Sequence, residues 1–154
     1  EKILHNGHWE ESAEDSTETR GFFIEDDGGF QKPMEYWIGA MVFTPDAKML
    51  ITGSRDNTIR FFEMPTMNEL RVVRGHNGWV RSLVVSPDGK VLISAGDDNT
   101  IRFWDIATGR NFRTDKTHGG AVRGIALSPD GLRLASASWD RTVKLWEGGV
   151  EPAE

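Results

Sequence analysis

The chain has 154 residues, a net charge of −6 and no cysteine, and 38% of its residues are hydrophobic. This composition supports a packed core and excludes disulfides, thiolate metal sites and cysteine nucleophiles. The absence of cysteine fits a reducing compartment, so we expect an intracellular location, cytoplasm or nucleus. No apolar run approaches the ~18 residues of a membrane-spanning helix, and we expect no membrane partner.

The charge is concentrated near the start of the chain. Residues 1–35 hold ten acidic and three basic side chains, whereas the remainder holds fourteen acidic and fifteen basic ones. We interpret residues 1–33 as an acidic leader, either a mobile linker or an acidic docking segment. Within it, the apolar run Phe22-Phe23-Ile24 predicts a short outer strand, which must pair with another strand to be stable.

From residue 34 to residue 149 the sequence repeats itself at an interval of 42 residues. The turn sequence Asp56-Asn57-Thr58 returns as Asp98-Asn99-Thr100 and as Asp140-Arg141-Thr142. A fixed period of this length indicates an array of supersecondary units. We divide this part into three repeats, 34–75, 76–117 and 118–149, followed by a tail, 150–154.

Each repeat contains short apolar runs separated by turns. The first runs span 36–43, 79–85 and 121–127, the second 49–53, 91–95 and 133–137, and the third 58–62, 100–104 and 142–146. A fourth run is predicted at 70–73 and a weaker one at 110–114. The connections are too short for helical crossovers, so neighbouring strands should be antiparallel. The sequence therefore predicts an all-β fold of three four-stranded antiparallel sheets, with Phe43, Val85 and Leu127 in the core.

Two repeats carry a matching set of polar and aromatic residues. In the middle repeat the set is His76, Ser94, Asp98 and Trp104, and in the third it is His118, Ser136, Asp140 and Trp146. With the turn Ser86-Pro87-Asp88-Gly89, this pattern resembles the WD-repeat family over residues 34–146. The resemblance implies a β-propeller built from four-stranded blades. It also implies a structural tetrad in which Asp accepts from His, His bonds the hydroxyl, and the hydroxyl accepts from the Trp ring N–H.

The first repeat departs from this pattern. Met34 stands where His is expected, Phe62 replaces Trp and Ala47 replaces the turn glycine, although Thr52 and Asp56 remain. We expect a first blade that is held by packing rather than by the tetrad, and that is the least stable of the three.

Three blades form an incomplete ring, because propellers have roughly four or more. The chain is therefore expected to be a piece of a larger propeller or a protomer that completes a ring by self-association. No apolar run follows Val143–Trp146, so residues 22–24 could supply the missing outer strand of the last blade.

The family resemblance also implies where a partner binds. Family members that bind peptides use three positions per blade on one face: Trp37, Gly39 and Arg55 in the first, Trp79, Arg81 and Asp97 in the second, and Ala121, Arg123 and Trp139 in the third. Trp and Arg dominate interface hot spots, and the Arg side chains would suit a carboxylate or phosphate. The predicted function is a non-catalytic scaffold that binds a protein or peptide. The alternative for these rings is packing between blades.

Two other classes of function stay open. A Ser-His-Asp set could belong to a hydrolase or lyase with Asp and His on the axial face, but one set per blade with Trp as terminal donor indicates a structural role. His76 and His118 have no second metal ligand recurring beside them, so no metal or cofactor is expected. Trp and Arg could also stack on single-stranded nucleic acid, although the near-neutral repeats argue against it.

Overall fold

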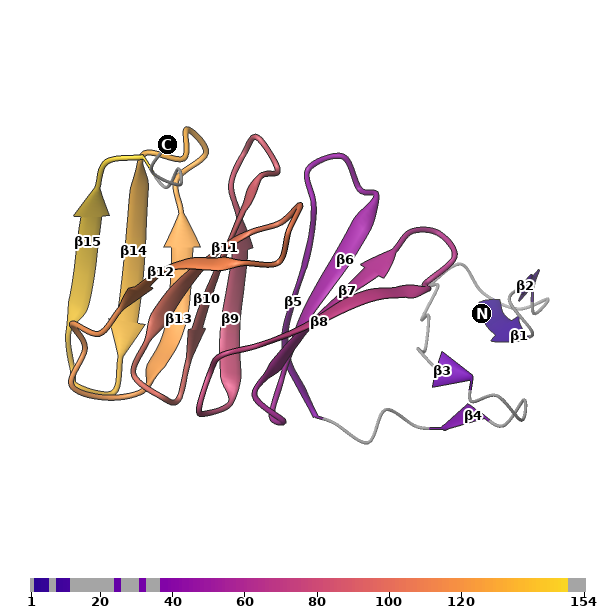
Figure 1. The fold of residues 1–154 in the computed structure, drawn as a ribbon, viewed down its shortest axis with the longest axis horizontal. Coiled ribbons are helices and arrows are strands. Elements are labelled where there is room, and N and C mark those ends of the chain that lie inside the picture. Colours follow the sequence, from indigo (N-terminus) through magenta and orange to yellow (C-terminus); the bar gives the residue numbers. More distant parts are fainter. Residues whose placement is uncertain (1, 6–7, 12–23, 26–30, 33–36, 150–154) are drawn as a thin grey trace. The chain divides into compact units, whose positions relative to one another are not determined.

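The computed structural model describes residues 2–5, 8–11, 24–25, 31–32 and 37–149. The chain divides into two compact units, Glu1–Tyr36 and Trp37–Glu154. The described part of the first unit forms two antiparallel pairs (Figure 1). These are β1 (Lys2–His5) with β2 (His8–Glu11), and β3 (Ile24–Glu25) with β4 (Gln31–Lys32).

The first unit contains strands within the residues expected to be an acidic leader. The pair β1–β2 lies near the start of that segment. Ile24, the last residue of the predicted outer strand, begins β3 and pairs with Lys32 of β4. The other two residues of that predicted strand, Phe22 and Phe23, lie outside the described residues, as does the tail 150–154.

The second unit consists of three antiparallel sheets, which we call blades 1, 2 and 3. Blade 1 comprises β5 (Ile38–Phe43), β6 (Met49–Ser54), β7 (Thr58–Glu63) and β8 (Glu69–Arg74). Blade 2 comprises β9 (Val80–Val85), β10 (Val91–Gly96), β11 (Ile101–Asp105) and β12 (Asn111–Asp115). Blade 3 comprises β13 (Val122–Leu127), β14 (Arg133–Ser138) and β15 (Val143–Glu147). Within each blade the strands follow one another in chain order.

The blades form an open row, so the expected all-β segment with an incomplete ring is confirmed (Figure 1). The first strands β5, β9 and β13 contact one another in that order along the row. Blades 1 and 2 have the four strands predicted. In the described residues blade 3 has three, because no strand pairs with the outer side of β15.

The turn between the first two strands of each blade is stabilised by its own side chains. In blade 2, the Ser86 hydroxyl donates to Asp88 at 2.5 Å and accepts from the Val91 amide at 2.9 Å. Gly89 closes the turn with φ of 73°, a left-handed conformation that glycine adopts without steric cost. Ala47 holds the same position in blade 1 with φ of 56°, where its Cβ adds strain.

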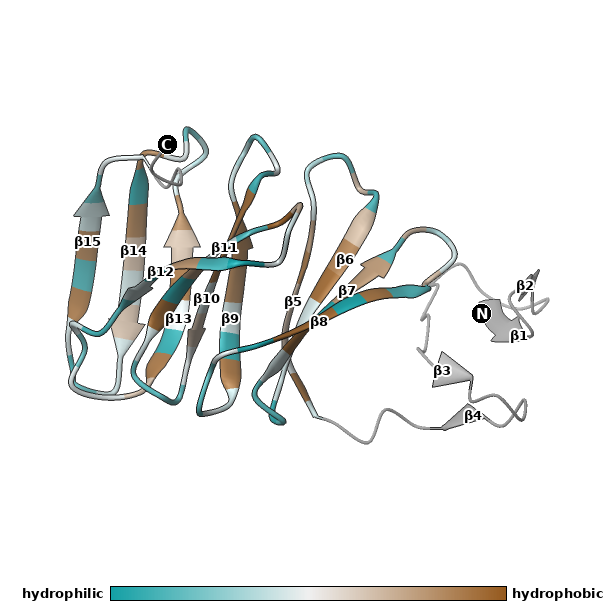
Figure 2. Ribbon diagram, in the orientation of Figure 1, coloured by the Kyte–Doolittle hydropathy of each residue, from teal (hydrophilic) through white to brown (hydrophobic). Residues whose placement is uncertain are grey.

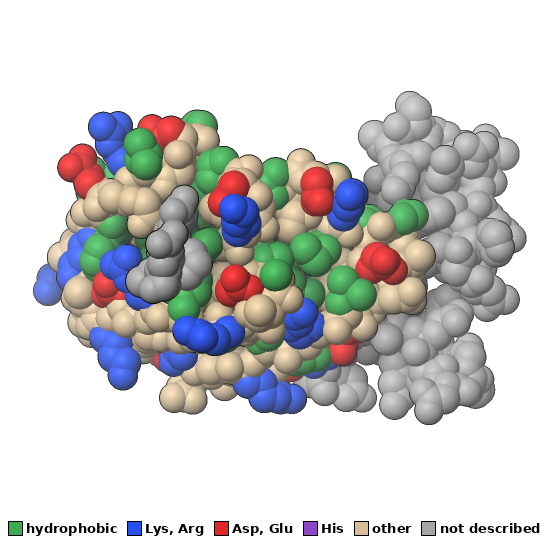
Figure 3. All heavy atoms as spheres, turned by 45° about the horizontal axis from the view of Figure 1, so that its top comes forward, with side chains coloured by type: hydrophobic (Ala, Val, Ile, Leu, Met, Phe, Trp, Pro, Cys, Tyr) green, Lys and Arg blue, Asp and Glu red, His purple; other side chains and the backbone are tan. Residues whose placement is uncertain are grey.

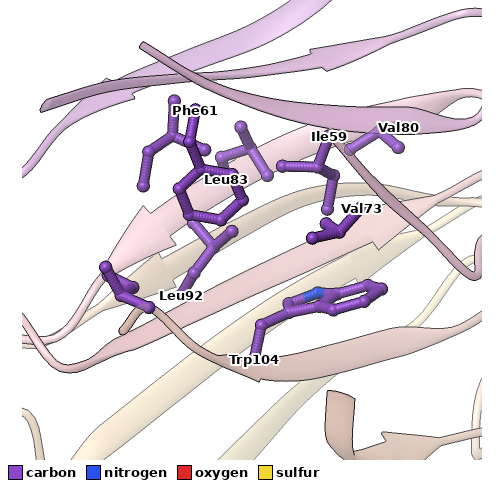
Figure 4. Close-up of a cluster of buried hydrophobic side chains, with 9 residues drawn as sticks. Ile59, Phe61, Val73, Val80, Leu83, Leu92 and Trp104 are labelled. Carbon is purple, nitrogen blue, oxygen red and sulfur yellow. The ribbon is translucent and has the colours of Figure 1, made fainter. Parts of the chain in front are cut away.

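Two hydrophobic clusters join the blades. Between blades 1 and 2, Phe61 of β7 and Leu83 of β9 lie near Leu92 of β10, and Trp104 of β11 lies beside them (Figure 4). A second cluster joins blade 2 to blade 3 through Ile93, Phe103, Val122, Ile125 and Leu134. Most of β9 is brown, in keeping with its four apolar residues, and one teal band marks Arg81 (Figure 2). A burial period of two is seen along β5, where partly buried and exposed side chains alternate.

One core prediction was wrong. Phe43 is 52% exposed, whereas Val85 and Leu127, at the same repeat position, are partly buried and pack against the two clusters. The three residues point to the same side of their blades, as their pairing with Leu50, Leu92 and Leu134 shows. The row of first strands begins with β5, so no described first strand lies on that side to cover Phe43, although Leu50 and Phe62 on the same side of blade 1 are each 3% exposed.

Candidate functional site

The structure brings the four polar and aromatic residues of blade 2 together in one hydrogen-bonded chain. Trp104 Nε1 donates to Ser94 Oγ at 2.8 Å, and Ser94 Oγ lies 2.7 Å from His76 Nε2. His76 Nδ1 lies 3.0 Å from both carboxylate oxygens of Asp98. Donation therefore runs from the indole through the hydroxyl and the imidazole to the carboxylate, and each buried polar group has a partner.

Blade 3 has the same arrangement, with a longer final bond. His118 lies 2.8 Å from Asp140 and 2.7 Å from Ser136 Oγ, whereas Trp146 Nε1 lies 3.3 Å from that hydroxyl. Trp104 is 2% exposed, but Trp146 is only partly buried. The difference follows from the outer strand, because β12 covers β11 in blade 2 while β15 is the described edge of blade 3.

The burial of the two serines bears on catalysis by these sets. Ser94 is fully buried and Ser136 is 2% exposed, and each hydroxyl already accepts from an indole N–H. A nucleophilic serine must present its hydroxyl to a substrate beside an oxyanion hole. The geometry of the two tetrads is therefore suited to holding the strands of a blade together, and it is not suited to acyl transfer.

Blade 1 uses a different set of contacts at the equivalent positions. The buried Thr52 hydroxyl has no hydrogen-bond partner in the described part of the chain, because the ring of Phe62, unlike that of tryptophan, has no N–H to donate. Asp56 accepts from the Thr58 hydroxyl at 2.6 Å and pairs with Arg60 at 3.1 Å. Arg60 also bonds Glu69 at 3.0 Å and so ties β7 to β8. Met34 lies outside the described residues.

The aspartates of the two tetrads, Asp98 and Asp140, have a lowered pKa. For Asp98, burial is the largest effect and acts to raise the pKa, but hydrogen bonds from His76, Asn77 and Thr100 hold it well below the ordinary value of 3.8. For Asp140, the hydrogen bond from the Thr142 hydroxyl is the largest effect, and the bond from His118 lowers its pKa further.

We therefore expect the chain to lose stability in acid. A carboxyl with a lower pKa in the folded chain stabilises the fold fully above about pH 4, and this contribution is lost as the pH falls towards the folded value. Urea unfolding followed by circular dichroism should show a free energy of unfolding that drops between pH 4 and pH 2. Asp98→Asn should be less stable at pH 7 and should show a smaller drop; an equal drop in both chains would contradict the assignment.

The predicted partner-binding residues of blades 1 and 2 lie in one cluster. The rings of Trp37 and Trp79 meet edge to face with centroids 6.5 Å apart. The Arg55 guanidinium lies 5.4 Å from the Trp37 centroid and 5.6 Å from the Trp79 centroid, and that of Arg81 lies 3.5 Å from the Trp79 centroid. These distances are typical of cation–π contacts.

Asp97 extends the cluster to blade 3. Arg81 Nη2 lies 2.6 Å and Arg81 Nε 2.9 Å from Asp97 Oδ2, while Arg123 Nη1 lies 3.4 Å from Oδ1. The Arg123 guanidinium in turn lies 4.3 Å from the centroid of Trp139. All seven side chains of the prediction therefore belong to one continuous series of contacts across three blades, which we call the Trp/Arg face: Trp37, Arg55, Trp79, Arg81, Asp97, Arg123 and Trp139.

The backbone places these side chains at the same edge of every blade. In each blade, the residue before the tetrad aspartate donates its amide to the residue at the start of the first strand: Arg55 to Trp37, Asp97 to Trp79 and Trp139 to Ala121, each at 2.9 Å. The start of β5 and the turn between β14 and β15 lie at the lower edge of Figure 1. The opposite edge, turned forward in Figure 3, shows basic and acidic side chains interspersed over its described part.

Gly39 and Ala121 are the two small residues among the nine predicted positions, and Ala121 is buried. A Cβ on Gly39 would lie 2.4 Å from Trp79 Nε1 and 2.6 Å from the Val80 carbonyl oxygen. Blades 2 and 3 carry Arg81 and Arg123 at this repeat position. The Trp79 ring therefore occupies the space that a side chain at position 39 would need.

The exposure of the rings differs along the face. Trp37 is 67% and Trp139 is 69% exposed, while Trp79 is partly buried between its neighbours. The alternative prediction, packing between blades, thus describes Trp79 and not the two outer rings. Sequence reasoning missed the pairing of Arg81 and Arg123 with Asp97, because no local signal connects positions 16 and 26 residues apart.

The described residues offer no alternative metal or membrane feature. They contain no group of three or more His, Cys, Asp or Glu side chains that could hold a metal ion. Nor does the described part contain a helix that is long and apolar enough to cross a membrane.

Comparison with known proteins agrees with this geometry. The model of the WD domain, G-beta repeat, matches residues 32–63, 67–105 and 109–147, more than half of the chain. The solved structures of U3-55K and of the RRP9 WD40 repeats are similar to this chain. Each shares 28% identity over 75% of this chain, with a TM-score of 0.71. The match covers 37% of each of those chains.

Proposed function

Because the chain belongs to the WD-repeat family, whose β-propellers present loops and strand ends on their faces, we propose that it is a non-catalytic scaffold that binds a protein or peptide through the Trp/Arg face. The observation that carries this proposal is the pair of outer rings, Trp37 and Trp139, which stay about two-thirds exposed although each is held by an arginine. An intracellular location, expected from the absence of cysteine, belongs to the same proposal.

The composition of the face supports a protein partner. Large aromatic side chains in water are costly, and exposed apolar groups that gather in one place mark interaction sites. Trp and Arg are the residue types that contribute most of the binding free energy at protein interfaces. The contacts among these side chains also hold them in place before binding, which lowers the entropy lost when a partner binds.

The test is the double variant Trp37→Ala/Trp139→Ala. Both side chains are exposed, so the variant should fold with a free energy of unfolding within about 0.5 kcal/mol of the wild type. A hot-spot residue contributes about 2 kcal/mol or more, so binding of a partner should weaken by at least about thirtyfold. Quantitative mass spectrometry of proteins retained by the immobilised chain would measure the loss, followed by titration of the purified partner.

A matched control is Leu132→Ala. Leu132 is 54% exposed and lies in the turn between β13 and β14, at the opposite edge of blade 3. It should retain the same partners as the wild type. Equal retention by the double variant and the wild type would contradict the proposed site.

Catalysis and nucleic-acid binding have less support. The abundant aspartates that suggested a hydrolase or lyase include Asp97, and that carboxylate is held by Arg81 and Arg123. The arginines also lie against the Trp79 and Trp139 rings on which nucleic-acid bases would stack. A protein or peptide partner therefore remains the better assignment.

A further inference from the structure

Resting on the proposed function, we infer that the Trp/Arg face selects an acidic peptide segment, in which carboxylates flank an apolar side chain. On this face the arginine donors outnumber the carboxylate acceptors, the net charge is positive, and an arginine already lies against each ring.

The acceptors of the face are already used. Among the seven side chains of the Trp/Arg face, Asp97 is the one that carries a carboxylate. Both of its oxygens accept from Arg81 at 2.6–2.9 Å, and Arg123 Nη1 lies 3.4 Å from Oδ1. The tetrad carboxylates Asp98 and Asp140 are turned inwards, with side chains 7% and 16% exposed, and accept from histidines and turn amides. A cationic ligand would therefore find no unshared carboxylate on the face.

The donors, in contrast, are in excess. A guanidinium has five N–H donors. Arg123 uses one of them in the 3.4 Å contact with Asp97. Arg55 is exposed and makes no ion pair within the described part of the chain; its contacts there are with the rings of Trp37 and Trp79. A ligand that completes this site must bring acceptors, and carboxylates match the planar donors of arginine best.

The charge of the face points in the same direction. Arg55, Arg81 and Arg123 carry three positive charges against the single negative charge of Asp97. Aromatic rings attract cations through their faces, but here an arginine already lies against Trp37, Trp79 and Trp139. A methylated lysine or an arginine of a partner would meet like charge at each ring. An anion next to an apolar group meets guanidinium donors and an exposed indole together.

The experiment is selection from a random-peptide phage library on the immobilised full chain, with the Trp37→Ala/Trp139→Ala variant as counter-selection. Peptides retained by the wild type alone are then synthesised, together with copies in which Asp and Glu are replaced by Asn and Gln. Affinities are measured by fluorescence anisotropy at low and high salt. We expect enrichment of Asp and Glu beside apolar residues, and an affinity about tenfold lower for the neutral copies and for Arg55→Gln.

The control for the charge change is Arg110→Gln. Arg110 is also exposed, but it precedes β12 at the opposite edge of blade 2, where its carbonyl accepts from Asp105. This variant should bind the acidic peptides like the wild type. Equal losses for Arg55→Gln and Arg110→Gln would show a general effect of net charge and would overturn the inference.

The remaining outcomes separate this inference from the proposed function. Peptides that depend on Trp37 and Trp139 but are neutral or basic would leave the proposed function intact and overturn the acidic preference. The absence of any peptide that depends on these rings would contradict both. Displacement of the selected peptides by a single-stranded oligouridylate, at a concentration where oligoglutamate does not displace them, would assign the face to nucleic acid instead.

Discussion

Replacing Trp104 by alanine is expected to lower the free energy of unfolding by about 3–5 kcal/mol, the range for a large aromatic side chain removed from a core. Trp104 is 2% exposed, packs between blades 1 and 2, and donates to Ser94 at 2.8 Å. The change leaves both a cavity and a hydroxyl without its donor. Urea unfolding followed by far-ultraviolet circular dichroism measures the loss without relying on tryptophan fluorescence.

The matched variant is Trp146→Ala, at the same repeat position in blade 3. Trp146 is partly exposed and lies 3.3 Å from Ser136, so its removal should cost clearly less. If Trp104→Ala prevents folding, Trp104→Phe keeps most of the volume and removes the donor, with an expected loss of about 1–3 kcal/mol. Equal losses of unfolding free energy at the two tryptophans would contradict the deeper burial of Trp104.

Replacing Gly53 by valine is expected to push blades 1 and 2 apart. A Cβ at this position would lie 2.5 Å from Val80 Cγ1 and 2.9 Å from Val80 Cβ, closer than side-chain atoms can approach. Val80 is fully buried and cannot move away without disturbing the cluster around it. Overpacking of a core costs about 1–3 kcal/mol and occasionally more, which thermal and urea unfolding would both detect.

Ala137→Val provides the control, since Ala137 occupies the same repeat position in blade 3. Ala137 is exposed and pairs with Val143, which is 76% exposed, so valine has space there and suits a strand. Its effect should stay within about 0.5 kcal/mol. A large loss at Ala137 would mean that a second copy of the chain covers this side of blade 3. Light scattering would then show a mass above 17.3 kDa for the wild type and a lower mass for the variant.

Much of the fold was predictable because its determinants are local. The apolar run 79–85 is β9 except for its first residue, and the run 91–95 is β10 with one residue added at its end. Short apolar runs and the hydrogen bonds of the Ser-Pro-Asp-Gly turn involve residues that are close in the chain, so they appear in the sequence itself. The pair β1–β2 was not predicted, because the four-residue strand β1 holds only two apolar residues and β2 only one.

Burial was less predictable, because it depends on neighbours that a strand cannot specify. Phe43 follows the same pattern as Val85 and Leu127, yet it is exposed, since no described first strand lies on its side of β5. In the candidate site, too, the residues could be predicted but their contacts could not. The periodic positions identified the residues of the Trp/Arg face, but not that Asp97 holds two arginines or that Trp79 lies over Gly39.

The sequence by itself determined the all-β class, the 42-residue repeat, the tetrads of blades 2 and 3 and the set of residues that form the Trp/Arg face. These follow from the repeat interval and from turn chemistry, in which each residue acts on its near neighbours. Only the tertiary structure decided which rings are exposed, which carboxylate is already paired and which residues of the end blades stay exposed. Those properties arise where side chains of successive blades meet, and the distances between such atoms depend on how the sheets pack rather than on any one strand.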